Sequence, residues 1–233
     1  AELENLASTA LRVTGTADGT SAAPALTTDE INALGITGRQ VTNDNLDAVV
    51  AAIASQTDGA AVDDVSKLSA VVDTAVAAFD SALAAVTNYA GDSTDDIGLV
   101  SGSTEYPAPT EAQYKALGID VTGFADSADL VASVNTLLAS GPVVGVDDAS
   151  AADVNTAAEV KTIFAAYDAI RTANDQGTLN LLQTDYEALG LGDVVDFSTE
   201  DAEKVSLLNT VLDTKSIVVG DVDEWSDLET VAE

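Results

Sequence analysis

One short phrase recurs three times along the chain, and this repetition constrains the fold more than any other feature. Ala-Leu-Gly followed by Ile or Leu occupies residues 33–36, 116–119 and 188–191. The residues on both sides of the phrase agree as well, so we treat the surrounding stretches as copies one, two and three. Recurrence at this distance predicts several similar structural units, each built from a few helices or strands.

A short helix is predicted before the glycine of each copy. The residue four positions before that glycine is large and apolar or aromatic in every copy: Ile31, Tyr114 and Tyr186. Thr27 with Glu30, and Thr110 with Gln113, have the spacing of a capping box that opens a helix. In copy three the nearest such pair, Thr184 with Glu187, is offset by two residues. The glycines themselves stand where a helix ends in a left-handed residue, so we expect them to be C-caps. They are Gly35, Gly118 and Gly190.

A second helix with one apolar face is predicted after each glycine. Its expected N-caps are Thr42, Asp126 and Ser198, each following an apolar residue as in a hydrophobic staple: Val41, Phe124 and Phe197. Apolar residues then recur at spacings of three and four, which indicates one buried face. They are Leu46, Val49, Val50 and Ile53; Leu130, Val134, Leu137 and Leu138; and Val205, Leu208, Val211 and Leu212.

A longer third helix is predicted after an acidic loop, roughly over residues 63–89 in copy one and 153–174 in copy two. Its apolar row is Val65, Leu68, Val72, Val76, Phe79 and Leu83 in copy one. In copy two the row is Val154, Val160, Ile163, Phe164, Tyr167 and Ile170. The sequence therefore predicts an all-α fold of tandem three-helix bundles in an elongated array.

The two chain ends are predicted to be the two halves of one more long helix. Aligning Trp225 with Val65 places Glu233 opposite Asp73 and Ala1 opposite Thr74. The predicted divisions are 1–22, the second half of a long helix plus a linker; 23–104, repeat 1; 105–178, repeat 2; and 179–233, repeat 3, truncated within its long helix. A half-helix of about three turns is marginal in water without a partner.

Two interpretations of these ends stay open. The chain is a piece of a longer array, or the C-terminal half-helix of one subunit docks beside the N-terminal half of the next in an open head-to-tail filament. The expected junction residues are Leu3, Leu6, Trp225, Leu228 and Val231. Trp225 matches Val65 and Val154 on the long helices, so we expect it to be a core residue rather than a binding site. Tyr106 is expected to be exposed and to join one repeat to the next.

The charge of the chain excludes several classes of partner. Its 40 acidic and 8 basic residues give a net charge of −32, and the basic residues are scattered singly. A field of this sign repels nucleic acid and anionic lipid, and neither nucleic-acid binding nor membrane insertion is expected. Partners are expected to be copies of the chain or neighbouring repeats, head to tail.

The inventory of residue types also argues against catalysis. The chain has no His and no Cys, so Ser-His and Cys-His systems and most zinc sites cannot be built. Carboxylate pairs alone could serve a glycosidase, but only with a cleft that holds and distorts a sugar. We therefore expect that the protein is not an enzyme and needs no cofactor.

Calcium is the one ligand that the acidic loops leave open. Clusters occur at residues 58–64, 92–96, 147–153 and 221–227, none with the spacing of an EF-hand loop. Three of them precede a long helix, where acidic residues cap free N–H groups and favour the helix dipole. The cluster of Asp92, Asp95 and Asp96 is least explained by a helix and is the candidate calcium site.

Three phrases in copy one resemble the helical tandem repeats of very large bacterial surface adhesins of the biofilm-associated and RTX-like type. They are Ala-Pro-Ala-Leu-Thr at 23–27, Gly-Ile-Thr-Gly at 35–38 and Val-Thr-Asn-Asp-Asn-Leu-Asp-Ala-Val at 41–49. The resemblance implies secretion, attachment to the cell surface, a role as a spacer and often calcium. Together with the matching chain ends, it leads us to expect a structural spacer or a head-to-tail filament subunit. The alternative function is a helical module that binds a protein or glycan, which would expose an apolar or aromatic patch on one repeat only.

Overall fold

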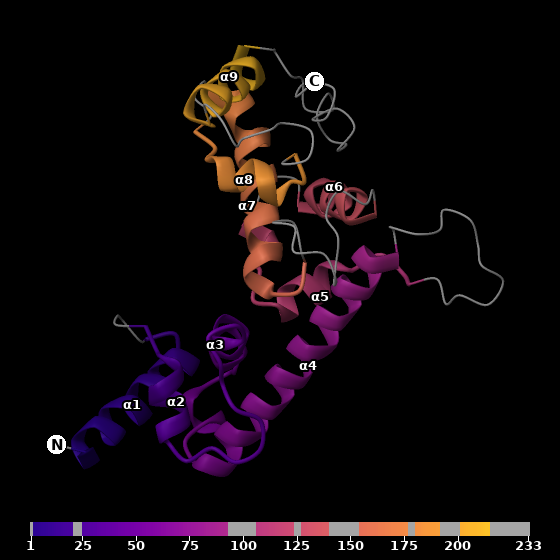
Figure 1. Ribbon diagram of the computed structural model, residues 1–233. Coiled ribbons are helices and arrows are strands. Elements are labelled where there is room, and N and C mark those ends of the chain that lie inside the picture. The colour runs from indigo at the N-terminus through magenta and orange to yellow at the C-terminus, as the bar shows by residue number, and fades with distance from the viewer. Residues whose placement is uncertain are drawn as a thin grey trace. The chain divides into compact units, whose positions relative to one another are not determined.

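The computed structural model describes residues 2–20, 25–92, 106–123, 127–139, 154–176, 180–191 and 201–214 (Figure 1). All regular structure in these ranges is helical, which confirms the predicted all-α class for this part of the chain. The α-helices are α1 (Glu2–Ala17), α2 (Thr28–Ala33), α3 (Leu46–Ala54), α4 (Val65–Asp92), α5 (Glu111–Ala116), α6 (Ser127–Ala139), α7 (Ala157–Gln176), α8 (Gln183–Ala188) and α9 (Asp201–Thr214). Two short 3₁₀ turns, Gly59–Ala61 and Val121–Gly123, accompany them.

The chain divides into two compact units. Unit 1 is residues 1–83 with 112–119, and unit 2 is residues 84–111 with 120–233. The division falls inside α4, after Leu83. Therefore the first part of this helix belongs to unit 1 and its last part to unit 2.

The three short helices occupy the same position in every copy, as predicted. Each of α2, α5 and α8 has six residues and ends two residues before its glycine. The glycines have φ of +78° at Gly35, +76° at Gly118 and +76° at Gly190, so the predicted left-handed helix ends are confirmed. Ile31, Tyr114 and Tyr186 are all fully buried. The short helices therefore each bury one large side chain in the core. Each is ended by a glycine, which adopts a positive φ without steric strain because it has no β-carbon.

The predicted capping box of copy one is confirmed, and copy three departs from that pattern as expected. The Glu30 N–H donates to Thr27 Oγ1 over 3.3 Å, and the Thr27 N–H donates to Glu30 Oε2 over 3.0 Å. In copy three, α8 begins in register with the other short helices, and its N-cap is Leu182. Because a leucine side chain has no acceptor, only half of the motif forms: the Leu182 N–H donates to Asp185 Oδ2 over 2.7 Å.

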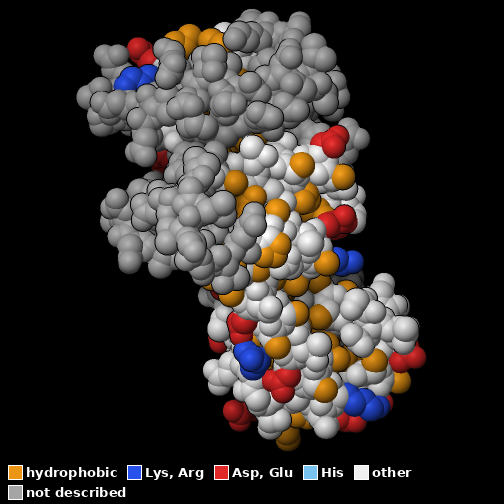
Figure 2. Space-filling model, turned by 90° about the vertical axis from the view of Figure 1, so that its right-hand side faces the viewer, with side chains coloured by type: hydrophobic (Ala, Val, Ile, Leu, Met, Phe, Trp, Pro, Cys, Tyr) orange, Lys and Arg blue, Asp and Glu red, His pale blue; other side chains and the backbone are white. Residues whose placement is uncertain are grey.

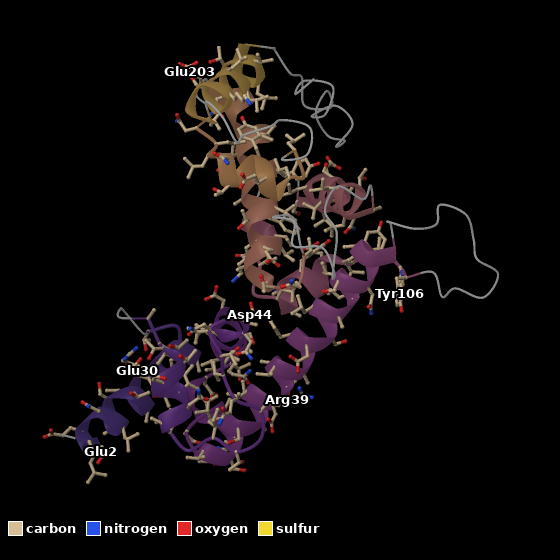
Figure 3. The ribbon with its side chains drawn as sticks, in the orientation of Figure 1. Glu2, Glu30, Arg39, Asp44, Tyr106 and Glu203 are labelled. Atoms are coloured by element: carbon tan, nitrogen blue, oxygen red, sulfur yellow. The ribbon has the colours of Figure 1, made fainter. Side chains whose placement is uncertain are left out.

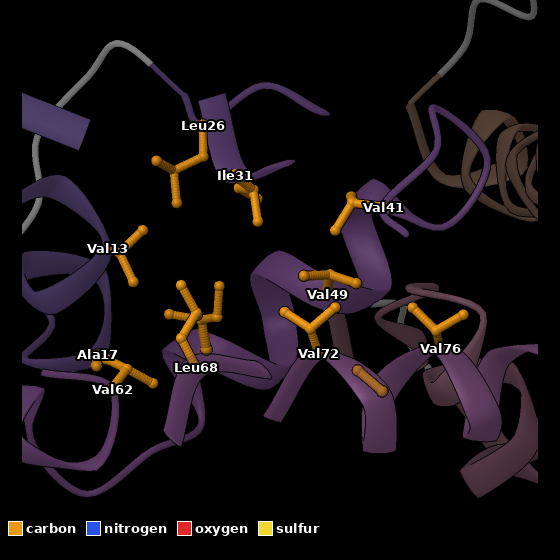
Figure 4. Close-up of a cluster of buried hydrophobic side chains, with 12 residues drawn as sticks. Val13, Ala17, Leu26, Ile31, Val41, Val49, Val62, Leu68, Val72 and Val76 are labelled. Carbon is orange, nitrogen blue, oxygen red and sulfur yellow. The ribbon is translucent and has the colours of Figure 1, made fainter. Parts of the chain in front are cut away.

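The core of unit 1 takes side chains from four helices, one more than the predicted three (Figure 4). The additional helix is α1, which contacts α2, α3 and the 3₁₀ turn at Gly59–Ala61. Its Val13 and Ala17 are buried among apolar side chains of α2, α3 and α4. The end of the helix that precedes copy one is therefore part of the core of copy one.

In unit 2, α7 lies between two copies. It contacts α6 of copy two, and it also contacts α8 and α9 of copy three. Every member of the apolar row predicted for this long helix is buried: Val154, Val160, Ile163, Phe164, Tyr167 and Ile170. The helix itself begins at Ala157, so Val154 packs from the residues just before it. One long helix thus supplies side chains that pack with the copy before it and the copy after it.

The other apolar rows are confirmed with one exception. In α3, α6 and α9 the predicted side chains are buried or half-buried. In α4, Leu68, Val72, Val76 and Phe79 are buried, but Val65 is 46% exposed. The expectation that Val65 and Val154 share a buried position is therefore wrong, because Val65 begins its helix on the solvent side.

The start of the second helix in copy one also differs from the prediction. The α-helix begins at Leu46 rather than after Thr42, and residues 43–45 form turns. Thr42 still accepts a hydrogen bond, from the Asn45 N–H over 3.4 Å, and Asn45 Oδ1 accepts one from the Thr42 N–H over 2.8 Å. This reciprocal pair stabilises a turn before the helix, which is the common alternative use of Thr and Asn side chains.

By length and composition, the stretch Val65–Ala90 of α4 is apolar enough to cross a membrane. Core helices of soluble proteins meet the same criterion, and 28% of the most apolar window is buried inside the chain. The exposed positions carry small or polar side chains such as Ala70, Thr74 and Ser81. The expected absence of membrane insertion stays a prediction.

Candidate functional site: the repeat junction

The strongest candidate site is the junction at which a long helix packs against the copy that follows it. In the predicted register Leu3 corresponds to Val76, and the same shift pairs Thr9, Val13 and Ala17 of α1 with Ala82, Val86 and Ala90 of α4. All six of these side chains are buried. The agreement supports the prediction that α1 is equivalent to the second half of a long helix.

Both helix ends also approach the same place in the copy that follows. The loop before α4 touches α1, where a β-carbon on Gly59 would come within 3.1 Å of the Thr14 carbonyl oxygen. The loop before α7 touches α4, where Thr87 Oγ1 donates to the Val154 carbonyl over 3.2 Å. Thr14 and Thr87 share one position in the register. Equivalent positions of α1 and α4 therefore each lie against a loop that precedes the next long helix.

Polar ties hold α1 to copy one. Arg12 Nη1 lies 2.6 Å from Glu30 Oε1, and Arg12 Nη2 donates to the Ala25 carbonyl over 2.7 Å. The hydrogen bond from Arg12, followed by that from Thr27, lowers the pKa of the Glu30 carboxyl below its ordinary value. Asp18 Oδ1 accepts from the Gly59 N–H over 2.5 Å. Arg12 and Asp18 had no predicted role, because nothing in the local pattern marks a long-range partner.

A second set of ties, also missed from the sequence, joins the loop after the short helix of copy one to α4. The Thr37 N–H donates to Ser69 Oγ over 3.0 Å, and the Arg39 N–H donates to Asp73 Oδ1 over 2.7 Å. Arg39 also forms an ion pair with Asp80, and Figure 3 shows it beside α4. These bonds attach the first part of α4 to the loop of copy one that follows α2.

Copies two and three share an asparagine tie that copy one lacks. Asn209 Nδ2 donates to the Leu181 carbonyl over 2.9 Å, and its Oδ1 accepts from the Leu181 N–H over 3.2 Å and from the Tyr186 hydroxyl over 2.8 Å. In copy two, Asn135 Nδ2 donates to the Pro109 carbonyl over 2.9 Å. Burial raises the pKa of the Tyr186 hydroxyl, so it stays protonated as a donor. The signal in the sequence is an Asn-Thr pair at 135–136 and 209–210.

Of the predicted junction residues, the structure describes only the two on α1. Leu3 is 82% exposed at the start of α1, and Leu6 is half-buried. Figure 3 shows the neighbouring Glu2 at the outer end of α1. Trp225, Leu228 and Val231 lie outside the described residues. The N-terminal half of the predicted junction is thus present as an exposed helical surface.

The acidic cluster before α4 forms the caps that its position predicts. Asp64 Oδ1 accepts from the Lys67 N–H over 2.9 Å, and Asp63 Oδ1 lies 2.6 Å from Lys67 Nζ. The hydrogen bond to Asp63 raises the pKa of Lys67. In the part of the chain that the structure describes, no group of three acidic side chains is placed to hold a metal ion. Asp95, Asp96 and the side chain of Asp92 lie outside that part, so the calcium site stays a prediction.

Exposed apolar side chains are dispersed over the described surface. The large ones are Leu3, Leu11, Val65, Tyr106, Leu182 and Leu207. The exposure of Tyr106 is confirmed at 40%. Among the described residues on the face shown in Figure 2, Lys and Arg side chains form isolated groups and no basic patch. The exposed apolar side chains therefore lie on several elements rather than on one face of a single repeat.

Comparison of the chain with protein-family models, with curated proteins and with solved structures gave no match. The site is therefore described by its own geometry alone. The repeat junction consists of packed helices from consecutive copies, and scattered ion pairs and amide hydrogen bonds stabilise it.

Proposed function

We propose that this chain is a structural, non-enzymatic segment of an extracellular bacterial surface assembly, of the kind used in adhesion, biofilm or surface layers. In this proposal its helical bundles stand in tandem in an elongated array and act as a spacer. The phrases in copy one that resemble adhesin repeats support this assignment. The charge of −32 is compatible with a soluble surface exposed to salt.

The observation that carries the proposal is the packing of α7 with two consecutive copies. Because α7 contacts α6 on one side and α8 and α9 on the other, one long helix packs with helices of both copies. A shared helix limits how far two bundles can bend against each other. That property suits a spacer that holds another domain at a distance.

Labelling of intact cells tests the location. Antibodies raised against the purified chain should label unpermeabilised cells of the source organism. Labelling that requires permeabilisation would contradict a surface role.

Small-angle scattering tests the spacer. The chain should give the profile of an elongated particle, and Ala165→Pro in the exposed face of α7 should broaden its distance distribution. A proline there removes a backbone hydrogen bond and costs about 3 kcal/mol. Ala165→Ser is the matched control. A compact profile, or a proline variant identical to the control, would contradict the proposal.

A further inference from the structure

The sequence contains two Asp-Gly pairs, at residues 18–19 and 58–59, and no Asn-Gly pair. In such a pair the backbone nitrogen of the glycine can attack the carboxyl carbon of the preceding aspartate and close a five-membered ring. Glycine makes this reaction easiest, because it has no β-carbon to hinder the attack and its backbone rotates freely. Each pair is therefore a chemically weak point of the backbone unless the fold restrains it.

One hydrogen bond joins the two Asp-Gly pairs. The Gly59 N–H donates to Asp18 Oδ1 over 2.5 Å, where α1 contacts the 3₁₀ turn Gly59–Ala61. This bond holds the attacking nitrogen of the second pair and the carboxyl group of the first pair. The Gly19 N–H, which belongs to the attacking nitrogen of the first pair, donates instead to the Thr16 carbonyl over 3.2 Å. The fold thus restrains both pairs.

The packing of α1 requires a glycine at position 59. Gly59 is buried, and a β-carbon on it would lie 2.9 Å from Asp18 Oδ2 and 3.1 Å from the Thr14 carbonyl oxygen. Any larger residue would push the end of α1 away from this turn. The close approach of the two segments therefore requires the glycine that makes Asp58 reactive.

The backbone of Asp58 also stands in the wrong conformation for ring closure. Its φ of −165° and ψ of 168° are extended. This ψ places the Gly59 nitrogen nearly opposite the Asp58 nitrogen about the Cα–C bond, whereas the ring requires it to eclipse Cβ. The peptide plane must therefore rotate, and the rotation carries the Gly59 N–H away from Asp18. The Asp58 side chain forms no capping hydrogen bond, so the bond to Asp18 is what opposes this rotation.

We propose that the Asp58–Gly59 bond is a latent site of isoaspartate formation, which the Asp18 carboxylate keeps closed while α1 is packed on copy one. When the hydrogen bond breaks, the Gly59 nitrogen bonds to Asp58 Cγ, and the amide proton and the carboxyl hydroxyl leave as water. Water then opens the ring. Attack at Cγ restores aspartate, and attack at the backbone carbonyl gives isoaspartate.

The product loosens the contact that restrained it. Isoaspartate routes the backbone through the side chain of residue 58 and lengthens it by one carbon, which displaces Gly59 from Asp18. A modified chain should therefore hold the end of α1 less firmly on copy one than an unmodified chain. This inference concerns the chemical lifetime of the fold and does not depend on the proposed function.

Isoaspartate formation in the full chain can be followed at physiological temperature and neutral pH. Methylation by a protein isoaspartate methyltransferase counts the product, and mass spectrometry of peptides locates it. In urea, the unfolded wild-type chain should form isoaspartate at Asp58. The folded wild-type chain should react at least about tenfold more slowly, the effect expected for a hydrogen bond to a charged group. Asp58→Glu, whose longer side chain does not close the five-membered ring, should remove the signal at this position.

Two variants separate the hydrogen bond from the general packing of α1. Asp18→Ala should speed the reaction at Asp58 in the folded chain about tenfold, because the Gly59 N–H loses its charged acceptor. Arg12→Met breaks the other polar tie of α1, and the reaction should stay within about twofold of wild type because the two ties share no partner. Circular dichroism should show the helix content of the wild type in both variants.

A further measurement needs no variant. In the wild-type chain, hydrogen exchange of the Gly59 amide and isoaspartate formation at Asp58 should rise together as urea is added below the unfolding transition. Four results would overturn the proposal: a folded wild-type chain that reacts as fast as the unfolded one, an Asp18→Ala chain as slow as wild type, an Arg12→Met chain as fast as Asp18→Ala, or exchange at Gly59 that rises without isoaspartate.

Discussion

Copy one and copy three bury apolar side chains at the same positions, which we call the apolar frame. They differ in the polar contacts that fix the residues just before their short helix. In copy one the ties come from the preceding helix α1, through Arg12 to Glu30 and to the Ala25 carbonyl. In copy three they come from the following helix α9, through Asn209 to both backbone groups of Leu181. The two copies thus bury the same apolar positions but use different polar contacts before their short helices.

The difference has a physical consequence for stability. The tie of copy one contains a carboxylate, so it weakens in acid. The tie of copy three is a neutral amide with three partners, including the buried Tyr186 hydroxyl, and it does not titrate near neutral pH. In copy two, the Asn135 side chain donates to the Pro109 carbonyl, but proline has no N–H that could donate to Asn135 in return. This tie therefore lacks one of the backbone hydrogen bonds that Asn209 makes in copy three.

The largest effect is expected at the glycine that ends the short helix of copy two. Gly118→Ala places a β-carbon about 2.8 Å from the Ala48 nitrogen while φ stays at +76°. A left-handed residue costs about 1–2 kcal/mol, and an overpacked contact adds about 1–3 kcal/mol. Gly35→Ala has nearly the same φ but open space, so only the first cost applies. Urea unfolding of both variants checks the difference, and equal losses would show that the close contact is not present.

The next effect concerns the asparagine ties. Asn209→Ala leaves the Leu181 N–H and the Tyr186 hydroxyl without their acceptor, which should cost about 2–3 kcal/mol. Asn135→Ala removes a tie whose proline partner has no N–H, so its cost should be smaller. Thermal unfolding of the two variants makes the comparison. A larger loss for Asn135→Ala would contradict the assignment of the ties.

A smaller effect is expected from acid in copy one. The pKa of Glu30 is lowered in the folded chain, so the stability that it adds is present above its unfolded pKa and is lost as pH falls through the folded value. An NMR titration should place the pKa of Glu30 below its ordinary value of 4.5. Arg12→Met should raise it towards that value. An unchanged titration in the variant would mean that the ion pair does not form in solution.

The smallest effect is expected from calcium. If the acidic loops act as helix caps, thermal midpoints in calcium and in chelator should be identical. A calcium-dependent rise that disappears in the Asp92→Asn, Asp95→Asn and Asp96→Asn variant would instead establish the metal site. Asp58→Asn is the control outside the cluster.

The sequence predicted the frame because the frame depends on local spacing. The three glycines, Ile31, Tyr114 and Tyr186, and the apolar face of each helix follow from periodicity, and the structure places them as expected. The polar ties could not be predicted, because Arg12 and Asn209 bind partners that are distant in the sequence. The helix start at Gln183 could not be predicted from capping residues, since Leu182 is not a capping residue and only Asp185 marks the position.

Native-state hydrogen exchange on a Phe164→Ala variant tests the shared long helix most directly. Phe164 is fully buried on α7, and its loss should cost about 3–5 kcal/mol. The account predicts that amide protection falls together in α6, α8 and α9, with Ala165→Lys on the exposed face as the unchanged control. Loss of protection in α6 alone, or in α8 and α9 alone, would show that α7 belongs to one copy and would contradict the account.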